Sequence, residues 1–362
     1  MHRPLALAAA ITLAVAASAS ARQQTPFLAS RHHISTVAST VPANGDVNPY
    51  GLAVVPASSG ALHAGDYLVS NFNARSNDQG TGTTIVQIAP NGRASLFATL
   101  RAGALPGPCP GGVGLTTALG VLPGGYVVVG SLPTSNGKSA TARAGCLIVL
   151  DSRGHAVETI AGADVDGPWD MATVTRGATT TLFVSNVLVG GAAAGVHTVD
   201  DSTIVRIRLH AAGGVPTVIG EQIVASKIPW RDDAAALVIG PTGLALAASG
   251  TLYVADTLES RIIAIPDAMT RSTALPDRGI TLSAGGDLEQ PLGLALAPNG
   301  DILTTNAGNG DVVETTTAGR QVAQAAADAK GGAGALFGLA VAPGGRGLLY
   351  VDDALNTLRL LH

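Results

Sequence analysis

The chain has 362 residues, of which 46 are Gly and 20 are Pro, with 46% hydrophobic residues and a formal charge of −4. This composition excludes a disordered chain and predicts a turn-rich globular protein with few long helices. Only three lysines are present and no basic run, so we expect no nucleic-acid partner.

The first residues have the pattern of a targeting segment. His2 and Arg3 precede a run of small apolar residues at 5–17, and a small-residue stretch ends at Ala21. A short basic start, an apolar run and an Ala-x-Ala site are typical of a secretory signal peptide. The run is too short to cross a bilayer. We therefore expect a signal peptide at 1–21, cleavage near Ala21, one domain at 22–362 without a membrane span, and export to the periplasm or the medium.

An apolar segment that contains a small residue, and often ends in Pro, recurs along the rest of the chain. Each copy is followed by a second apolar segment that ends in small or acidic polar residues, then by a third and a weaker fourth. Such short runs, bounded by Gly, Pro, Asn and Asp, are strand signals. The six copies of the first segment are at 49–56, 116–123, 168–172, 241–246, 291–298 and 336–343.

Six repeats of four strands predict an all-β fold, a six-bladed β-propeller of four-stranded antiparallel blades. The sixth repeat contains only three strands before the chain ends at His362. We expect residues 33–38 to supply its missing strand, which closes the ring and leaves no open sheet edge.

The Pro-x-Gly-Leu-Ala openings at 49–53, 241–245 and 291–295, and the segment 252–257 followed by Arg261, resemble NHL-repeat propellers. They are more distantly similar to SMP-30/gluconolactonase-like and strictosidine-synthase-like propellers. The resemblance covers about residues 33–361 and implies a fold shared by binding proteins and enzymes.

The resemblance also implies where a metal would sit. SMP-30-like lactonases hold a divalent cation with carboxylate and Asn side chains at the first-strand openings. Hard cations need several oxygen ligands, and Asp170 is the one acid nearby. We therefore expect no metal and no cofactor, and no set of catalytic residues is identified. The matching positions are Tyr50, Thr117, Trp169, Thr242, Leu292 and Phe337.

The chain contains two cysteines, Cys109 and Cys146. Export to an oxidising compartment favours a disulfide over a metal or catalytic pair. The predicted topology places Cys109 in the connection entering repeat two and Cys146 at the start of the third strand of that repeat. A disulfide is the prediction, and two unpaired buried thiols are the alternative.

Long loops gather on one side of one face, which we call the top face because the second strands end there. The loops 72–83, 132–145 and 187–201 have 12, 14 and 15 residues, whereas their counterparts in repeats four to six have three or four. The long connections at 100–114 and 225–241 reach the same face. Long loops in a compact domain are usually functional or disordered. We predict a binding region on the top face of repeats one to three; flexible decoration is the alternative.

Three sets of residues are candidates for ligand binding, and each has a structural alternative. Polar residues at the ends of the second strands either form a ring around the axis or satisfy turn backbone groups. Aromatic residues at the first-strand openings either line a channel mouth or pack against one another. The third set lies on the long loops and consists of a Trp followed by a charged run, together with a His and two acids; the lone His is either a ligand contact or a solvated side chain. The candidates of the first set are Asn71, Ser131, Asn186, Asp256, Asn306 and Asp353; those of the second are Tyr50, Trp169 with the adjacent Asp170, Leu292, Phe337, Thr117 and Thr242; those of the third are Trp230, Arg231, Asp232, Asp233, His197, Asp200 and Asp201.

We conclude from the sequence that this is an exported NHL-type propeller acting as a ligand- or protein-binding module. Its partner would be an unidentified small molecule or an envelope protein or glycan. The alternative is a lactonase- or lyase-like hydrolytic enzyme with a site built from Asp170, Asn186, Asp256 and Asn306. Whether the protein is an enzyme stays open at this stage.

Overall fold

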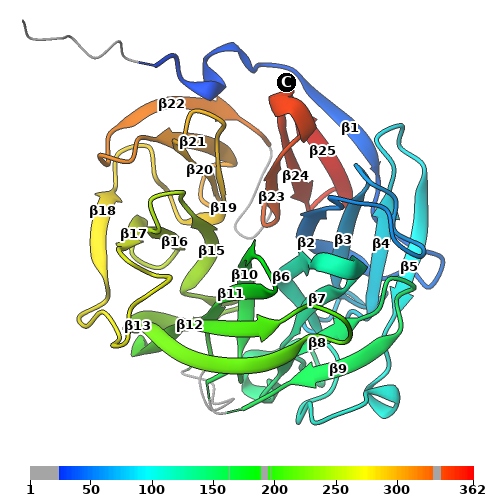
Figure 1. Ribbon diagram of the computed structural model, residues 1–362. Coiled ribbons are helices and arrows are strands. Elements are labelled where there is room, and N and C mark those ends of the chain that lie inside the picture. Colours follow the sequence, from blue (N-terminus) through cyan, green and yellow to red (C-terminus); the bar gives the residue numbers. More distant parts are fainter. Residues whose placement is uncertain (1–23, 163, 189–194, 196, 329–335) are drawn as a thin grey trace, which may run out of the picture.

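The structure is a computed structural model that describes residues 24–362 except 163, 189–194, 196 and 329–335. The expected signal peptide at 1–21 lies outside the described residues. Within them, six β-sheets surround a central axis, as Figure 1 shows, so the predicted six-bladed propeller is confirmed. The described part contains no helix with the length and apolar character that a bilayer crossing requires.

The first strand of each repeat lies nearest the axis, and the second and third strands follow outward; the outermost strand of the last blade comes from the N-terminal end of the chain. Blade 1 contains β2 (Val47–Val54), β3 (Tyr67–Asn73), β4 (Thr84–Ile88) and β5 (Ala94–Thr99). Blade 2 contains β6 (Leu115–Val121), β7 (Val127–Ser131), β8 (Cys146–Leu150) and β9 (Ala156–Ile160). Blade 3 contains β10 (Pro168–Arg176), β11 (Thr179–Asn186), β12 (Val199–His210), β13 (Thr217–Asp233) and β14 (Leu237–Ile239).

The second half of the ring is more regular. Blade 4 contains β15 (Pro241–Leu246), β16 (Leu252–Asp256), β17 (Arg261–Ile265) and β18 (Ile280–Ala284). Blade 5 contains β19 (Pro291–Leu296), β20 (Ile302–Asn306), β21 (Asp311–Thr315) and β22 (Gln321–Ala326). Blade 6 contains β23 (Leu339–Val341), β24 (Leu348–Asp352), β25 (Thr357–Leu361) and, from the other end of the chain, β1 (Ile34–Ser39).

Pairing of the two chain ends closes the ring. β1 runs antiparallel to β25, with Ile34 opposite Leu361 and Ser39 opposite Thr357. The predicted closure is therefore confirmed. The strand that closes the ring begins and ends one residue later than the expected segment 33–38. Without β1, β25 would expose a row of unpaired backbone groups at the edge of blade 6.

The segment before β1 is held by a buried carboxylate of the neighbouring blade. Glu314 on β21 accepts hydrogen bonds from the backbone N–H groups of Phe27 (2.7 Å) and Leu28 (2.8 Å). Both of these apolar side chains are buried in the core between blades 5 and 6. The N-terminal segment is thus attached to blade 5 before it completes blade 6.

Close approach of the first strands explains why small residues recur in them. A Cβ atom on Gly338 would lie 2.6 Å from the carbonyl oxygen of Tyr50 in the next blade. A Cβ on Gly293 would clash with the carbonyl oxygen of Phe337. Real Cβ atoms do not approach a backbone oxygen so closely, so only glycine permits this spacing at the axis.

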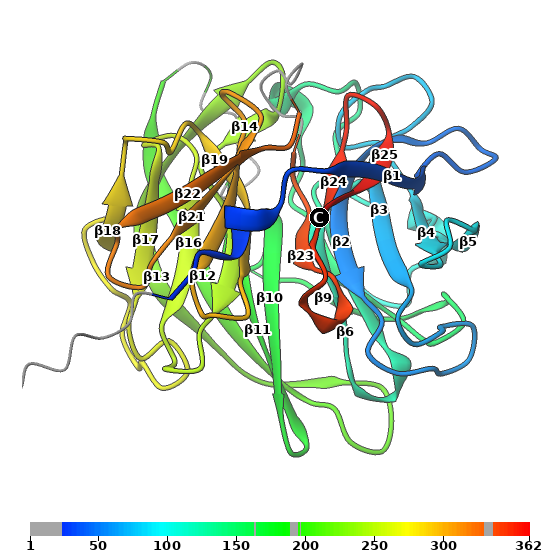
Figure 2. The same cartoon turned by 90° about the horizontal axis from the view of Figure 1, so that it is seen from above.

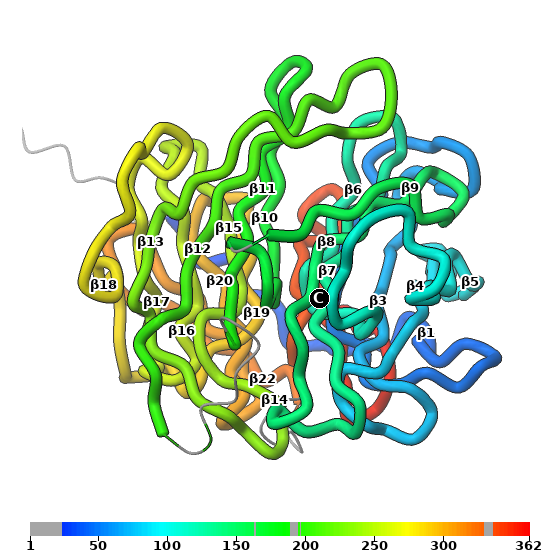
Figure 3. Tube along the Cα trace, turned by 90° about the horizontal axis from the view of Figure 1, so that it is seen from below, coloured from blue at the N-terminus to red at the C-terminus, as the bar shows by residue number. Residues whose placement is uncertain are grey.

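Blade 3 differs from the expected four strands. The stretch 225–241, expected as a connecting loop, continues β13 to Asp233 and then turns back as β14. The two strands pair from Arg231 opposite Ile239 to Asp233 opposite Leu237. Figures 2 and 3 show the disc edge-on, with β14 at the top face and the long strands β10–β13 projecting from the opposite face. The β13–β14 hairpin therefore adds a structured element to the top face.

The predicted disulfide is present: Cys109 is bonded to Cys146, with their Cα atoms 5.2 Å apart. It joins the connection before β6 to the first residue of β8. The bond therefore fixes a long top-face connection to the body of blade 2.

Deleting residues 22–40 removes both β1 and the segment held by Glu314. We expect the truncated protein to aggregate, because β25 then presents an unpaired edge and the apolar groove that buries Phe27 and Leu28 is exposed. Size-exclusion chromatography and thermal unfolding of the truncated and mature chains measure this. A soluble truncation that unfolds cooperatively would show that the ring does not need its N-terminal strand.

Candidate functional site

The first-strand openings meet in a cluster of stacked aromatic rings at the axis. The ring of Tyr50 lies between those of Phe72 and Phe337, with centroid distances of 4.3 and 3.8 Å. Trp169 meets Tyr50 edge-on at 5.8 Å. None of the four side chains is more than 1% exposed. The structure thus brings Tyr50, Trp169 and Phe337 together as predicted, but as a packed cluster rather than an open mouth; their role in ligand binding stays a prediction.

The β13–β14 hairpin covers this aromatic cluster from the top face. Trp230, Leu237 and Val238 are buried in the same apolar core as the four rings. Trp230 also donates an indole hydrogen bond to Asp201 at the start of β12. The candidate Trp230 is therefore part of the cover above the axis.

Blade 1 holds the tip of this hairpin. The side-chain amide of Gln79 donates hydrogen bonds to the carbonyl oxygens of Ala234 (3.2 Å) and Ala235 (2.8 Å). Gln79 belongs to the long loop after β3, so this contact joins blade 3 to blade 1 across the top face.

The residues at the axis do not fit the divalent cation of the SMP-30-like pattern. Tyr50, Trp169 and Phe337 fill the space with stacked carbon rings. Thr242, one of the two threonines of the set, is engaged with Thr257 Oγ1 at 3.0 Å and with a neighbouring carbonyl group, and a threonine hydroxyl is a weak ligand for a hard cation. Within the described ranges, no three His, Cys, Asp or Glu side chains lie close enough together to hold a metal ion.

Asp170 is the one acidic side chain at a first-strand opening. It lies on β10 next to Trp169, and its carboxylate accepts a hydrogen bond from the N–H of Met171 (2.7 Å). Burial raises the pKa of Asp170 to about 7, and this hydrogen bond only partly opposes the shift. Asp170 is therefore partly protonated at neutral pH.

The polar residues that end the second strands bond to nearby turns. Asn186 accepts from the N–H of Gly167 at 2.9 Å. Asp256 forms a buried ion pair with Arg261 (2.8 Å). The amides of Asn71 and Asn306 donate to the carbonyl oxygens of Thr40 (3.1 Å) and Asp287 (2.7 Å). These contacts agree with the structural alternative for the four candidates, whose contribution to ligand binding stays untested.

In blade 6 this structural role falls to Asp352 rather than to Asp353. Asp352 ends β24 and pairs with Arg359 at 3.1 Å, as Asp256 pairs with Arg261 in blade 4. Asp353 begins the following turn and lines a cavity on the top face. Burial, followed by the neighbouring charge of Asp352, raises the pKa of Asp353 to about 8. At neutral pH its carboxyl group is mostly protonated and can donate a hydrogen bond.

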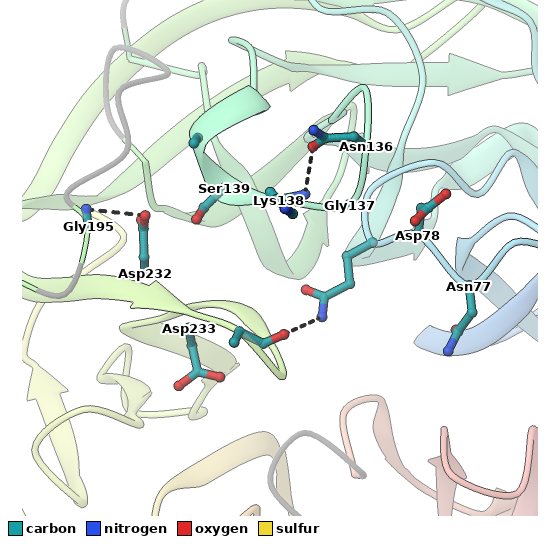
Figure 4. A pocket seen from close by; sticks show the side chains of 12 residues that line it. Asn77, Asp78, Asn136, Gly137, Lys138, Ser139, Gly195, Asp232 and Asp233 are labelled. Atoms are coloured by element: carbon teal, nitrogen blue, oxygen red, sulfur yellow. Dashed lines mark hydrogen bonds between the residues drawn. The ribbon is translucent and has the colours of Figure 1, made fainter.

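A cavity of about 610 Å³ lies between the long loops of blades 1 to 3. We call it the blade 1–3 cavity. Figure 4 shows Asp232 and Asp233 of the β13–β14 hairpin on one side and Asn77 and Asp78 of blade 1 on the other. Its lining residues are Asn77, Asp78, Gln79, Asn136, Gly137, Lys138, Ser139, Ala140, Gly195, Asp232, Asp233 and Ala234.

Local hydrogen bonds hold the walls of this cavity. Asn136 accepts from the N–H of Lys138 (3.2 Å) and from the hydroxyl of Thr141 (2.7 Å), which shapes the loop of blade 2. Asp232 accepts from the N–H of Gly195 at 3.2 Å. The ammonium group of Lys138 has no carboxylate within ion-pair distance among the described residues. A cation and several carboxylates thus share one cavity, and the cation is not neutralised by the wall.

A second top-face cavity, of about 420 Å³, lies between blades 6 and 1. We call it the blade 6–1 cavity. It shares Asn77 and Gln79 with the blade 1–3 cavity, so the contact of Gln79 with the hairpin lies between the two.

The long loops singled out in the sequence can be compared with the cavities on the top face. The loops 72–83 and 132–145 do supply cavity walls on the top face of blades 1 and 2, as loop length suggested. Of the named candidates, Asp232 and Asp233 line the blade 1–3 cavity and Asp353 lines the blade 6–1 cavity, whereas His197 is exposed on the loop before β12 and lines neither. Gln79 and Lys138 were not singled out as ligand contacts, because nothing in the sequence distinguishes them from other polar loop residues.

Replacing Trp169 with Ala tests the packing of the aromatic cluster. We expect the free energy of unfolding to fall by about 3–5 kcal/mol, because a buried ring is removed and its neighbours cannot fill the space. Chemical denaturation measures the change. The control Leu355→Ala, at a side chain that is 56% exposed, should change the stability by less than about 0.5 kcal/mol. A loss no larger than in this control would contradict tight packing at the axis.

Replacing Asp353 with Asn tests its buried carboxyl group. In the unfolded chain Asp353 ionises near its ordinary pKa of 3.8, but in the folded protein only near 8. The folded state therefore loses stability as the pH rises from about 4 to 8, and an amide at this position avoids the loss. We expect the Asp353→Asn variant to melt at a higher temperature than the wild type at pH 8 and at the same temperature near pH 4. A difference in Tm that does not vary with pH would exclude this explanation.

Comparisons with known proteins define the fold but no family. No family model matches the chain, and no curated protein matches it. Solved structures that resemble it include a gluconolactonase from Xanthomonas campestris, with a TM-score of 0.58, 15% identity and coverage of 92% of this chain and 91% of that one. A regucalcin, described as a calcium-binding protein, from Agrobacterium tumefaciens matches with a TM-score of 0.56, 14% identity and coverage of 91% and 93%. A virginiamycin B lyase from Staphylococcus aureus matches with a TM-score of 0.51, 11% identity and coverage of 91% and 98%. The chain is thus a six-bladed propeller similar in fold to SMP-30/gluconolactonase-like and lyase propellers, and the NHL resemblance finds no further support.

Proposed function

We propose that the protein is an exported binding protein that holds a small polar molecule in the blade 1–3 cavity. The observation that carries the proposal is an exposed lysine, Lys138, without a carboxylate partner among the described residues, in the lining of a cavity of about 610 Å³. This volume is within the roughly 300–1,000 Å³ typical of small-molecule sites. The cavity also lies where the long loops of repeats one to three predicted a site.

The wall chemistry indicates the kind of molecule. Lys138 favours a ligand with an anionic group, such as a carboxylate or a phosphate. Asp78 and Asp232 on the other walls accept hydrogen bonds and favour hydroxyl or amino groups elsewhere on the same molecule. The combination suits a small acid that carries hydroxyl or amino groups, such as a sugar acid or an amino acid.

Export is part of the proposal. The apolar segment at 5–17, followed by small residues up to Ala21, has the pattern of a signal peptide. The bond between Cys109 and Cys146 is of a kind that persists in oxidising compartments such as the periplasm. Both features agree with a binding protein of the cell envelope.

An enzyme of the lactonase- or lyase-like kind is the second candidate. The raised pKa of Asp170, about 7, suits a general acid or base at neutral pH. The similar structures include proteins named as a gluconolactonase and as a lyase. Metal analysis of the purified protein and turnover assays with lactones and esters separate the two candidate functions. Turnover by the wild type that is lost in the Asp170→Asn variant would favour the enzyme.

Binding by the blade 1–3 cavity is tested by thermal shift and calorimetry with sugar acids, amino acids and short-chain hydroxy acids. We expect at least one of these probes to bind, and Lys138→Ala to weaken that binding about tenfold or more, because a charge-assisted hydrogen bond contributes roughly 1.5–3 kcal/mol. Lys227→Ala, at an exposed lysine outside the cavity, is the charge-matched control. Equal weakening by both substitutions, or no binding of any anionic probe, would contradict the proposal.

A further inference from the structure

Blade 3 projects from the face of the disc opposite the top face. Its strands β12 (12 residues) and β13 (17 residues) are the longest of the described part of the chain, and Figures 2 and 3 show the ends of β10–β13 standing out from the ring. Two turns form this end, and the N–H of Ala211 in one donates to the carbonyl oxygen of Ala178 in the other at 2.9 Å. We call residues 176–179 and 206–219 together the blade 3 tip.

Apolar side chains are exposed at this tip. Val215, Val218 and Ile219 are 40%, 41% and 47% exposed. They are three of the seven large apolar side chains exposed in the described residues, and they lie within five positions of one another. Single exposed apolar residues are ordinary, but a group of them in one place marks an interaction surface.

Basic side chains share one face of the same projection. Residues directly opposite each other in paired strands lie on one face of a sheet, and alternate residues of a strand do as well. Arg176 lies opposite Thr179, which lies opposite His210. Arg206 and Arg208 alternate with His210 along β12, so three arginines and one histidine lie on one face.

None of these arginines is neutralised by a carboxylate. Arg176, Arg206 and Arg208 form no ion pair among the described residues. Arg206 donates instead to the carbonyl oxygen of Ala268 in blade 4 at 2.9 Å. Burial, followed by the neighbouring charge of Arg208, lowers the pKa of Arg206. The guanidinium groups therefore repel one another, and an anionic partner would relieve this repulsion.

The nearby acids do not cancel this charge. Glu221 is the one acid of the segments 171–182 and 204–224. It lies opposite Ile207, and therefore on the other face of the sheet from the arginines. Asp267, on the turn after β17, forms no ion pair with any described residue. A chain with a formal charge of −4 thus carries a positive patch beside an apolar end.

We propose that the blade 3 tip docks on an anionic membrane surface. The arginines face the lipid phosphate groups, and Val215, Val218 and Ile219 enter the boundary between headgroups and acyl chains. A soluble polyanion would use only the charges, and a second copy of the chain would use only the apolar edge, whereas an anionic bilayer uses both. The tip lies on the face opposite the two top-face cavities, so this docking leaves them open and does not depend on the function proposed for them.

Sedimentation of the full mature chain with lipid vesicles tests the proposal. One kind of vesicle is an equimolar mixture of phosphatidylcholine and phosphatidylglycerol, and the other is phosphatidylcholine alone. We expect the chain to bind the mixed vesicle and to bind the neutral one about tenfold more weakly or less, because the neutral surface does not attract arginine. Added salt should weaken binding to the mixed vesicle by screening the same attraction.

Two pairs of substitutions separate the two contributions. Arg176→Gln with Arg208→Gln removes two exposed charges and should weaken binding to the mixed vesicle about tenfold or more. Val218→Thr with Ile219→Thr keeps β-branched residues on the strand and should weaken binding about fivefold or more, because less apolar area enters the lipid. Both pairs replace exposed side chains, so the melting temperature should stay unchanged.

Matched substitutions away from the blade 3 tip are the controls. Arg101→Gln with Arg143→Gln removes two exposed charges from blades 1 and 2, and Leu355→Thr changes an exposed apolar residue of blade 6. Both should bind the mixed vesicle as the wild type does.

Three results would overturn the inference: equal weakening by these controls, equal binding to the neutral vesicle, or no vesicle binding. Binding of dextran sulfate in place of vesicles would indicate a soluble polyanion. Self-association in place of vesicle binding, lost in Val218→Thr with Ile219→Thr, would indicate a second copy of the chain. Either outcome would overturn docking on a membrane.

Discussion

Six sheets converge on the axis of this propeller, and the space that they leave must be filled. Here aromatic rings fill it: Tyr50 is stacked between Phe72 and Phe337, with Trp169 edge-on. Rings of this size bury a large apolar area, and their stacked and edge-on contacts contribute about 0.5–1.5 kcal/mol per pair beyond it. Because these rings come from blades 1, 3 and 6, the cluster joins blades that are far apart in the sequence.

The filled axis determines where polar chemistry can lie. A carboxylate placed among the rings would lose its hydration without gaining a partner, and the pKa of about 7 at Asp170 shows that penalty at the edge of the cluster. The β13–β14 hairpin then packs its apolar side chains onto the rings and closes the top of the axis. Cavities with polar walls are consequently displaced from the axis to the spaces between loops. The hairpin tip, held by Gln79, separates two such spaces of different chemistry.

Repetition made the fold predictable, since six similar segments in sequence imply six similar blades, and the missing strand of the last repeat pointed to the N-terminus. The hairpin could not be predicted in this way. Residues 225–241 occur once, and the polar run Arg231-Asp232-Asp233 has the composition of a loop. The run 231–233 forms a strand because the short segment Leu237–Ile239 pairs with it. In addition, the adjacent Trp230 and the paired Leu237 and Val238 are buried against the aromatic cluster. Both causes are tertiary contacts. Local propensity does not carry such information.

The two adjacent acids at the end of β24 show why site residues are harder to predict than strands. Asp352 and Asp353 are chemically identical in the sequence, and either could match the strand-ending acid of blade 4. The register decides, because Asp352 lies opposite Thr357 and reaches Arg359, which leaves Asp353 on the turn. One carboxyl group is then held in an ion pair, whereas the pKa of the other is raised to about 8, so that it is mostly protonated at neutral pH and can donate a hydrogen bond in a cavity wall. A difference of one position in the strand therefore separates a structural ion pair from a group available to a ligand, and only the three-dimensional arrangement distinguishes them.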